Sequence, residues 1–128
     1  MFVRGIRGAT TVENNEETEI LTATTELLNH IIAENGIVPE EIASVFVTVT
    51  NDLTATFPAR AIREMAGWEL VPLMCSLEVP VLGSLPLCVR LMVMVNTDKN
   101  QDEIVHIYLK EAMRLRPDLS KLTKSTSK

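Results

Sequence analysis

The sequence has few cysteines, histidines and aromatic residues, and each shortage excludes a class of protein. Aromatic residues make up 4 % of the 128 residues, so we expect an aliphatic core. The two cysteines, Cys75 and Cys88, form no disulfide framework, and reduced thiols are typical of the cytoplasm. Neither they nor the two histidines, His30 and His106, have the spacing of metal ligands, so the sequence predicts no metal site.

Long apolar runs and basic clusters are also missing. The apolar stretch between residues 71 and 95 is broken by Glu78, Arg90 and three prolines, so we expect no transmembrane helix. Arg4 and Arg7 interrupt the apolar start of the chain, so we expect no signal peptide. Twelve basic against seventeen acidic residues leave a formal charge of −5, which disfavours nucleic-acid binding. These features predict a cytoplasmic protein without nucleic-acid or membrane partners.

The motifs of nucleophilic catalysis are absent as well. The sequence contains no Gly-x-Ser-x-Gly motif, no Walker loop and no cysteine–histidine pair at a known spacing. His30 falls near the apolar stripe of a predicted helix and is assigned a structural role, and His106 borders a predicted strand. The chemistry must then be sought among the charged residues.

The most informative stretch is Leu87–Val95, in which eight of nine residues are apolar. A short run rich in β-branched residues predicts a strand that is covered on both faces. Arg90 stands in the middle of this strand, and its guanidinium cannot become neutral when it is buried. It therefore needs an anionic partner, which is either the carboxylate of Glu78 or a bound ligand. Arg7 on another predicted strand and Arg63 on a predicted helix are further candidates for binding an anion. Arginine is suited to this role because its guanidinium can bind a carboxylate through two hydrogen bonds.

The predicted elements define the fold class. Strands are predicted at residues 2–12, 43–50, 69–74, 87–95 and 106–109, and helices at residues 14–36, capped by Asn14, and 58–67. The order β-α-β-α-β-β-β predicts an α+β or split-βαβ arrangement. Two helices cannot cover both faces of five strands, so we expect another subunit to cover the face with Val89, Leu91 and Val93. Residues 1–119 are predicted to form one domain, and residues 120–128 a disordered tail.

Several short motifs follow one another in a fixed order along residues 2–119. Each motif alone is weak evidence for a family, but together, in this order and spacing, they are specific. They comprise Arg4-Gly5-Ile6-Arg7-Gly8-Ala9-Thr10-Thr11-Val12, Asp52-Leu53, Phe57-Pro58-Ala59, Gly67-Trp68, Val71-Pro72, Glu78, Arg90, Asn96-Thr97-Asp98, Gln101-Asp102, His106-Ile107-Tyr108-Leu109 and Leu115-Arg116-Pro117-Asp118-Leu119. In these motifs the sequence resembles the AroH-class chorismate mutases.

The resemblance implies an enzyme that rearranges chorismate to prephenate on the route to phenylalanine and tyrosine. It implies a ferredoxin-like fold of chorismate-mutase type, with a mixed five-stranded sheet and two helices. It also implies a homotrimer that forms a pseudo-α/β barrel with active sites between subunits. The reaction is a one-step Claisen rearrangement that needs no nucleophile, proton transfer, metal or cofactor. This agrees with the absence of nucleophilic motifs.

The resemblance also assigns roles to single residues. Arg90 would donate to the ether oxygen of the breaking bond, where negative charge develops in the transition state. Arg7 and Tyr108 would hold a carboxylate of the substrate. Glu78 and Cys75 would bind the ring hydroxyl, and Glu78 would also face the developing positive charge. Phe57, Ala59, Arg60 and Arg63 would also bind the substrate and are expected from a neighbouring subunit. Met74 is a further substrate-binding residue. Leu115 and Arg116 would close the mouth of the site.

Two positions depart from the pattern of the family. Arg60 stands where lysine is common, and Met74 stands where threonine is common. The first change keeps the positive charge. The change at Met74 has no effect on the site if this residue contacts the substrate through its backbone. It would affect the site if the side chain makes the contact.

Two other functions remain open. One is an imine deaminase of the small trimeric family that shares this fold, which would not need Arg7, Arg63 and Glu78 together. The other is a non-catalytic trimer that binds a small carboxylate, for which the departure at Met74 is the one hint.

Overall fold

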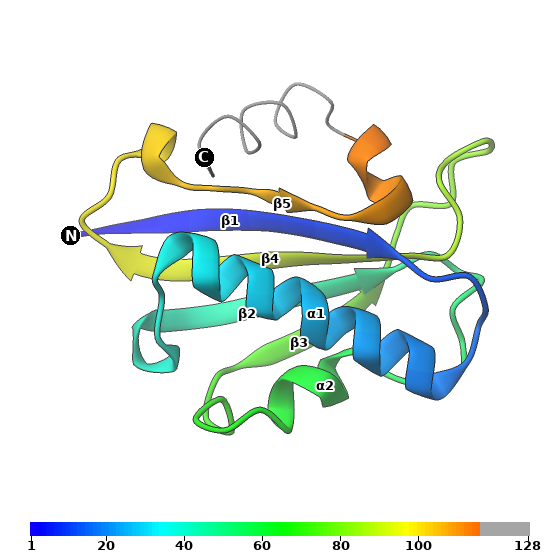
Figure 1. The fold of residues 1–128 in the computed structure, drawn as a ribbon, viewed down its shortest axis with the longest axis horizontal. Coiled ribbons are helices and arrows are strands. Elements are labelled where there is room, and N and C mark those ends of the chain that lie inside the picture. The colour runs from blue at the N-terminus through cyan, green and yellow to red at the C-terminus, as the bar shows by residue number, and fades with distance from the viewer. Residues whose placement is uncertain (116–128) are drawn as a thin grey trace.

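The computed structural model describes residues 1–115 of the chain, which form one mixed five-stranded sheet with two helices (Figure 1). The elements are β1 (Phe2–Thr11), α1 (Glu17–Asn35), β2 (Ile42–Val49), α2 (Ala59–Arg63), β3 (Leu73–Leu77), β4 (Cys88–Thr97) and β5 (Ile107–Tyr108), with short 3₁₀ helices at Pro39–Glu41, Gln101–Glu103 and Lys110–Arg114. This confirms the predicted α+β class. Among the described residues, no helix is both long and apolar enough to cross a bilayer.

The strand order is β3-β2-β4-β1-β5, so the fourth strand lies at the centre of the sheet. β4 is antiparallel to both β1 and β2, whereas β2 pairs with β3 and β1 with β5 in parallel. Strands β1 and β2 are joined through α1 and are separated by β4. This is the split-βαβ connection that the element order predicted.

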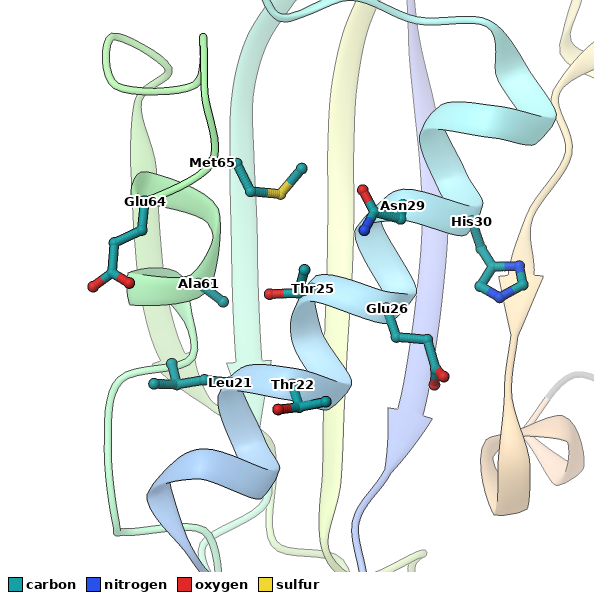
Figure 2. Close-up of a pocket in the computed structure, with 9 residues that line it drawn as sticks. All are labelled: Leu21, Thr22, Thr25, Glu26, Asn29, His30, Ala61, Glu64 and Met65. Atoms are coloured by element: carbon teal, nitrogen blue, oxygen red, sulfur yellow. The ribbon is translucent and has the colours of Figure 1, made fainter.

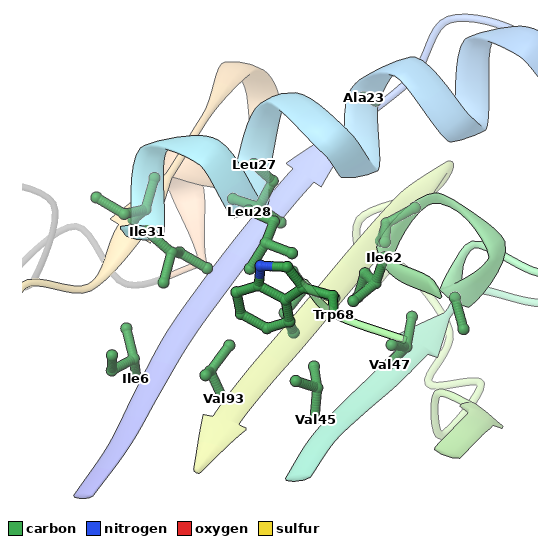
Figure 3. Packing of buried hydrophobic residues seen from close by; sticks show 14 of the residues in the cluster. Ile6, Ala23, Leu27, Leu28, Ile31, Val45, Val47, Ile62, Trp68 and Val93 are labelled. Atoms are coloured by element: carbon green, nitrogen blue, oxygen red, sulfur yellow. The ribbon is translucent and has the colours of Figure 1, made fainter. Parts of the chain in front are cut away.

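The hydrophobic core lies between the sheet and the two helices. Figure 3 shows Leu27, Leu28 and Ile31 of α1 directed toward the strand residues Ile6 and Val93. Gly8 of β1 makes this close approach possible, because a Cβ atom there would lie 2.6 Å from Cδ1 of Ile31. This main cluster is aliphatic except for the buried Trp68, in agreement with the low aromatic content of the sequence. Its buried members also include Ile20, Val45, Val47, Ile62, Val89, Leu91 and Val95.

The prediction that both faces of the Arg90 strand are covered was wrong for the single chain. Burial alternates along β4: Val89, Leu91 and Val93 are buried beneath the helices, whereas Arg90 and Met92 on the other face are half-buried. The open face of the sheet is therefore the opposite of the one expected. Met92 and Met94 occupy half-buried positions beside Arg90 on this face, and their apolar character hid the alternation in the sequence.

Two local boundaries also differ from the prediction. The third strand is Leu73–Leu77 rather than residues 69–74, because β2 pairs with Leu73 through Leu77 while Trp68 and Val71 form a turn and are buried in the core. The cap of α1 is Glu16 rather than Asn14. The Glu16 carboxylate accepts a hydrogen bond from the amide of Thr18 at 3.1 Å. The predicted end of the helix at Gly36 is confirmed, with a left-handed φ of 61°.

Asn35 connects the end of α1 to the chain that precedes β5. Its side chain is buried, and Nδ2 donates to the carbonyls of Ile31 at 3.0 Å and Val105 at 2.9 Å. Oδ1 accepts from the amide of Val105 at 2.9 Å. The amide of one side chain thus satisfies both backbone groups of Val105.

Candidate active site

A cavity of about 200 Å³ opens on the uncovered face of the sheet and collects four of the predicted site residues. Arg7 reaches it from β1, Arg90 from β4, Tyr108 from β5, and Glu78 from the segment that follows β3. We call it the arginine cavity. Its other lining residues are Gly8, Phe46, Thr48, Leu91 and Met92.

Arg90 and Glu78 form an ion pair at this cavity. Nη1 of Arg90 lies 3.2 Å from Oε1 of Glu78, and the two side chains are 42 % and 23 % exposed. The hydroxyl of Thr48 donates to the other carboxylate oxygen of Glu78. Arg90 is therefore not buried in the single chain, contrary to the prediction. Its guanidinium has five donors, so pairing with one carboxylate oxygen leaves donors for a ligand in the cavity.

Thr48 was missed by the analysis of the sequence. It lies directly opposite Arg90 in the pairing of β2 with β4. The signal was present, because Thr48 interrupts the buried positions Val47 and Val49 and so belongs to the open face. It could not be used before the register between the two strands was known.

Arg7 is the second cation of the arginine cavity. Among residues 1–115, its guanidinium has no hydrogen-bond or ion-pair partner, so its donors are available. Its backbone amide donates to Nδ1 of His106 at 2.9 Å. Tyr108, also lining this cavity, is 7 % exposed and packs in a small cluster with Leu115.

Polar contacts anchor both ends of the loop between Glu78 and Leu87. The amide of Glu78 donates to the carbonyl of Val49 at 2.9 Å, and the amide of Leu87 donates to Oδ2 of Asp52 at 2.9 Å. Leu87 has a positive φ of 52°, which a leucine adopts only when its surroundings impose it. The carboxylate of Asp52 supplies that constraint. The loop thus places Glu78 at one end and the start of the Arg90 strand at the other.

The remaining predicted site residues lie elsewhere in the single chain. Phe57, Arg60 and Cys75 line a second cavity of about 660 Å³ between α2 and the β3 edge of the sheet. Arg60 is paired there with Glu17 at 3.3 Å. Phe57, Arg63, Met74 and Cys75 are exposed, and Ala59 is buried. Leu115 is half-buried near Tyr108, and Arg116 lies outside the described residues.

A third hollow lies on the opposite side of the molecule and contains none of the predicted site residues. It is an open groove of about 660 Å³ between α1 and α2, with Thr22, Thr25 and Asn29 on one side and Glu64 on the other (Figure 2). It holds no arginine, so it offers no match for an anionic ligand. The described residues also contain no cluster of histidine, cysteine and carboxylate side chains that could hold a metal ion.

The two thiols are expected to react very differently. Burial raises the pKa of the Cys88 thiol to about 11, whereas Cys75 is exposed. Because the thiolate is the reactive form, a disulfide reagent at about pH 8 should modify Cys75 quickly and leave Cys88 unmodified until the protein unfolds. Counting released chromophore per chain before and after denaturation checks this. In Cys75→Ser the fast reaction should disappear, and a second fast thiol in the native protein would contradict the assignment.

Comparisons with known proteins agree on one family. Residues 3–119 match the family described as chorismate mutase type I. The chain is 52 % identical to the chorismate mutase AroH of Bacillus subtilis (strain 168) over 126 residues, which is 98 % of both proteins. It is 53 % identical to the chorismate mutase AroH of Thermus thermophilus over 119 residues, covering 92 % of this chain and 97 % of the relative. A solved chorismate mutase from Clostridium thermocellum superposes with a TM-score of 0.83 at 47 % identity, covering 86 % of this chain and 97 % of the other.

Proposed function

Because this chain belongs to the type I chorismate mutase family, it isomerises chorismate to prephenate in aromatic amino-acid biosynthesis, and we propose that the arginine cavity performs this reaction. The observation that carries the proposal is that one cavity contains two guanidinium groups with free donors and a single carboxylate. Arg7 and Arg90 match a dianionic substrate, and Glu78 supplies a fixed negative charge beside them.

Electrostatic stabilisation by Arg90 is the proposed source of the rate enhancement. In the rearrangement the breaking C–O bond places negative charge on the ether oxygen, and the ring becomes electron-poor. A donor held at that oxygen stabilises the transition state more than the substrate. The ion pair with Glu78 holds the Arg90 guanidinium in place. In the proposed complex the Glu78 carboxylate faces the electron-poor ring. No proton has to move in this step.

Arg7 and Tyr108 are proposed to hold the substrate in its reactive conformation. Chorismate must fold so that the two carbons that will be joined come close together, and fixing this conformer lowers the barrier by removing conformational freedom. Arg7 is suited to the task because a guanidinium binds a carboxylate through two parallel hydrogen bonds. Tyr108 is held rigidly by its burial and adds a hydroxyl at the same cavity.

We propose that the complete site forms between the subunits of a homotrimer. Phe57 and Arg60, which are expected from a neighbouring subunit, lie at a different cavity from Arg90 within one chain, so a neighbouring copy is needed to bring them to it. The exposed apolar surface supports such an assembly, because monomers rarely expose this much of it. It includes Phe46, Phe57, Met74, Leu77, Val79, Val81 and Leu82.

The first test is to incubate the purified protein with chorismate, follow the loss of the diene absorbance of chorismate and detect prephenate as the product. The expected result is turnover far above the uncatalysed rearrangement, with saturation in chorismate. Saturable binding without turnover would instead support the non-catalytic carboxylate-binding trimer. Hydrolysis of an imine substrate, with chorismate left intact, would support the deaminase.

A further inference from the structure

The pairing between β1 and β5 ends at Gly8 and does not extend to Arg7. Their parallel pairing covers Gly8 with Ile107 and Ala9 with Tyr108. The amide of Arg7 comes next, and a continued strand would offer it a backbone acceptor on the β5 side. Both backbone groups of Val105 are instead occupied by the side chain of Asn35.

The imidazole of His106 supplies the acceptor that the strand does not. The amide of Arg7 donates to Nδ1 of His106 at 2.9 Å. A neutral imidazole can accept at Nδ1 only when its proton is on Nε2. The ring lies at a cavity of about 400 Å³ that Arg4 and Arg7 also line. The hydrogen bond from the Arg7 amide is made by the neutral ring with its proton on Nε2.

We propose that His106 is a positioning residue for the mutase reaction: it fixes the backbone of β1 at Arg7 and thereby orients the Arg7 guanidinium toward a substrate carboxylate. Arg7 lines both the arginine cavity and the cavity that holds His106, whereas His106 lines only the latter. The backbone of β1 at Arg7, which carries this hydrogen bond, sets the point and direction from which the Arg7 side chain enters the arginine cavity. His106 thus acts through Arg7, without contact to the reacting atoms. The inference rests on the proposed function of the arginine cavity.

Two substitutions separate the acceptor from the bulk of the side chain. In His106→Asn, Oδ1 lies at the same number of bonds from the backbone as Nδ1 and can accept the same hydrogen bond. In His106→Leu, similar volume remains but the acceptor is lost. We expect His106→Leu to lower kcat/KM about 5–30-fold, mainly through KM, and His106→Asn to stay within about twofold of the parent. His30→Leu, the same change at an exposed histidine on α1, should leave the kinetics unchanged.

A double-mutant cycle with Arg7 tests whether His106 acts through that residue. In an Arg7→Ala background, His106→Leu should have no further effect on kcat/KM, because the group that it orients is gone. Equal losses in both backgrounds would mean a general structural role and would overturn the proposal. Loss of activity in His106→Asn, together with loss of a limb of the pH profile, would make His106 an acid or base and would also overturn it.

A measurement without substrate keeps this inference separate from the proposed function. Nuclear magnetic resonance should detect a scalar coupling between the backbone nitrogen of Arg7 and Nδ1 of His106, and faster hydrogen exchange at the Arg7 amide in His106→Leu than in His106→Asn. A protein that shows the coupling but not the turnover would refute the mutase activity alone. A protein that shows turnover but neither the coupling nor the difference in exchange would refute the role of His106 alone.

Discussion

Replacing Arg90 by alanine is expected to lower kcat by about 10²–10³ while the fold is retained, because one fixed transition-state donor is lost. The loss should fall mainly on kcat, since the donor matters most when charge has developed on the ether oxygen. The side chain is 42 % exposed, so its removal leaves no large buried cavity. Circular dichroism and urea unfolding of the variant should therefore resemble the parent.

Arg90→Lys tests whether charge alone is sufficient. Lysine keeps one positive charge but loses the planar fork that can bind Glu78 and the substrate at the same time. We expect a loss nearly as large as that of Arg90→Ala. Arg114→Ala is a suitable control, because Arg114 forms an exposed pair with Glu111, and such pairs contribute little. Near-normal turnover in Arg90→Lys would contradict the proposed mechanism.

Asn35→Leu is expected to destabilise the protein by about 2–4 kcal/mol, because it leaves both backbone groups of Val105 without their partner. Leucine has nearly the same shape as asparagine, so the change removes hydrogen bonds rather than volume. Asn35 is 2 % exposed, and water cannot readily replace the lost contacts. Urea unfolding at a fixed protein concentration measures the difference in free energy.

The same helix offers a matched control for this prediction. Asn29 lies on α1 but is exposed, so Asn29→Leu should change the free energy of unfolding by less than about 0.5 kcal/mol. If the two variants had the same stability, the link between α1 and the segment before β5 would not contribute as described. A changed denaturant dependence in Asn35→Leu would indicate partial unfolding of that segment instead.

The strands were predictable because their β-branched residues dominate the local preference, and the end of α1 was predictable because Gly36 adopts a left-handed conformation. The face of the sheet that stays open was not predictable. Its half-buried positions on β4 carry Met92 and Met94 beside Arg90, and these methionines are as apolar as their buried neighbours. The third strand was misplaced because Trp68 and Val71 have strand-forming character but are used to fill the core.

The candidate site was predictable in part. The unusual position of Arg90 in an apolar strand pointed to an anion, and the structure places Arg7, Glu78 and Tyr108 at the same cavity. Phe57, Arg60 and Cys75 line another cavity, which is formed where α2 lies beside the β3 edge of the sheet. The spacing of residues along the sequence does not specify which strand forms that edge.

The central place of β4 has a consequence for how the chain folds. β4 is bonded to β1 on one side and to β2 on the other, although it follows both of them by about forty residues or more along the chain. Such distant pairing slows folding, because the entropy of closing long loops is lost before the contacts form. During synthesis, β1, α1 and β2 emerge before the strand that joins them. The centre of the sheet therefore forms only after residue 97 has left the ribosome, and the surroundings of Arg90 are completed only when Tyr108 of β5 follows.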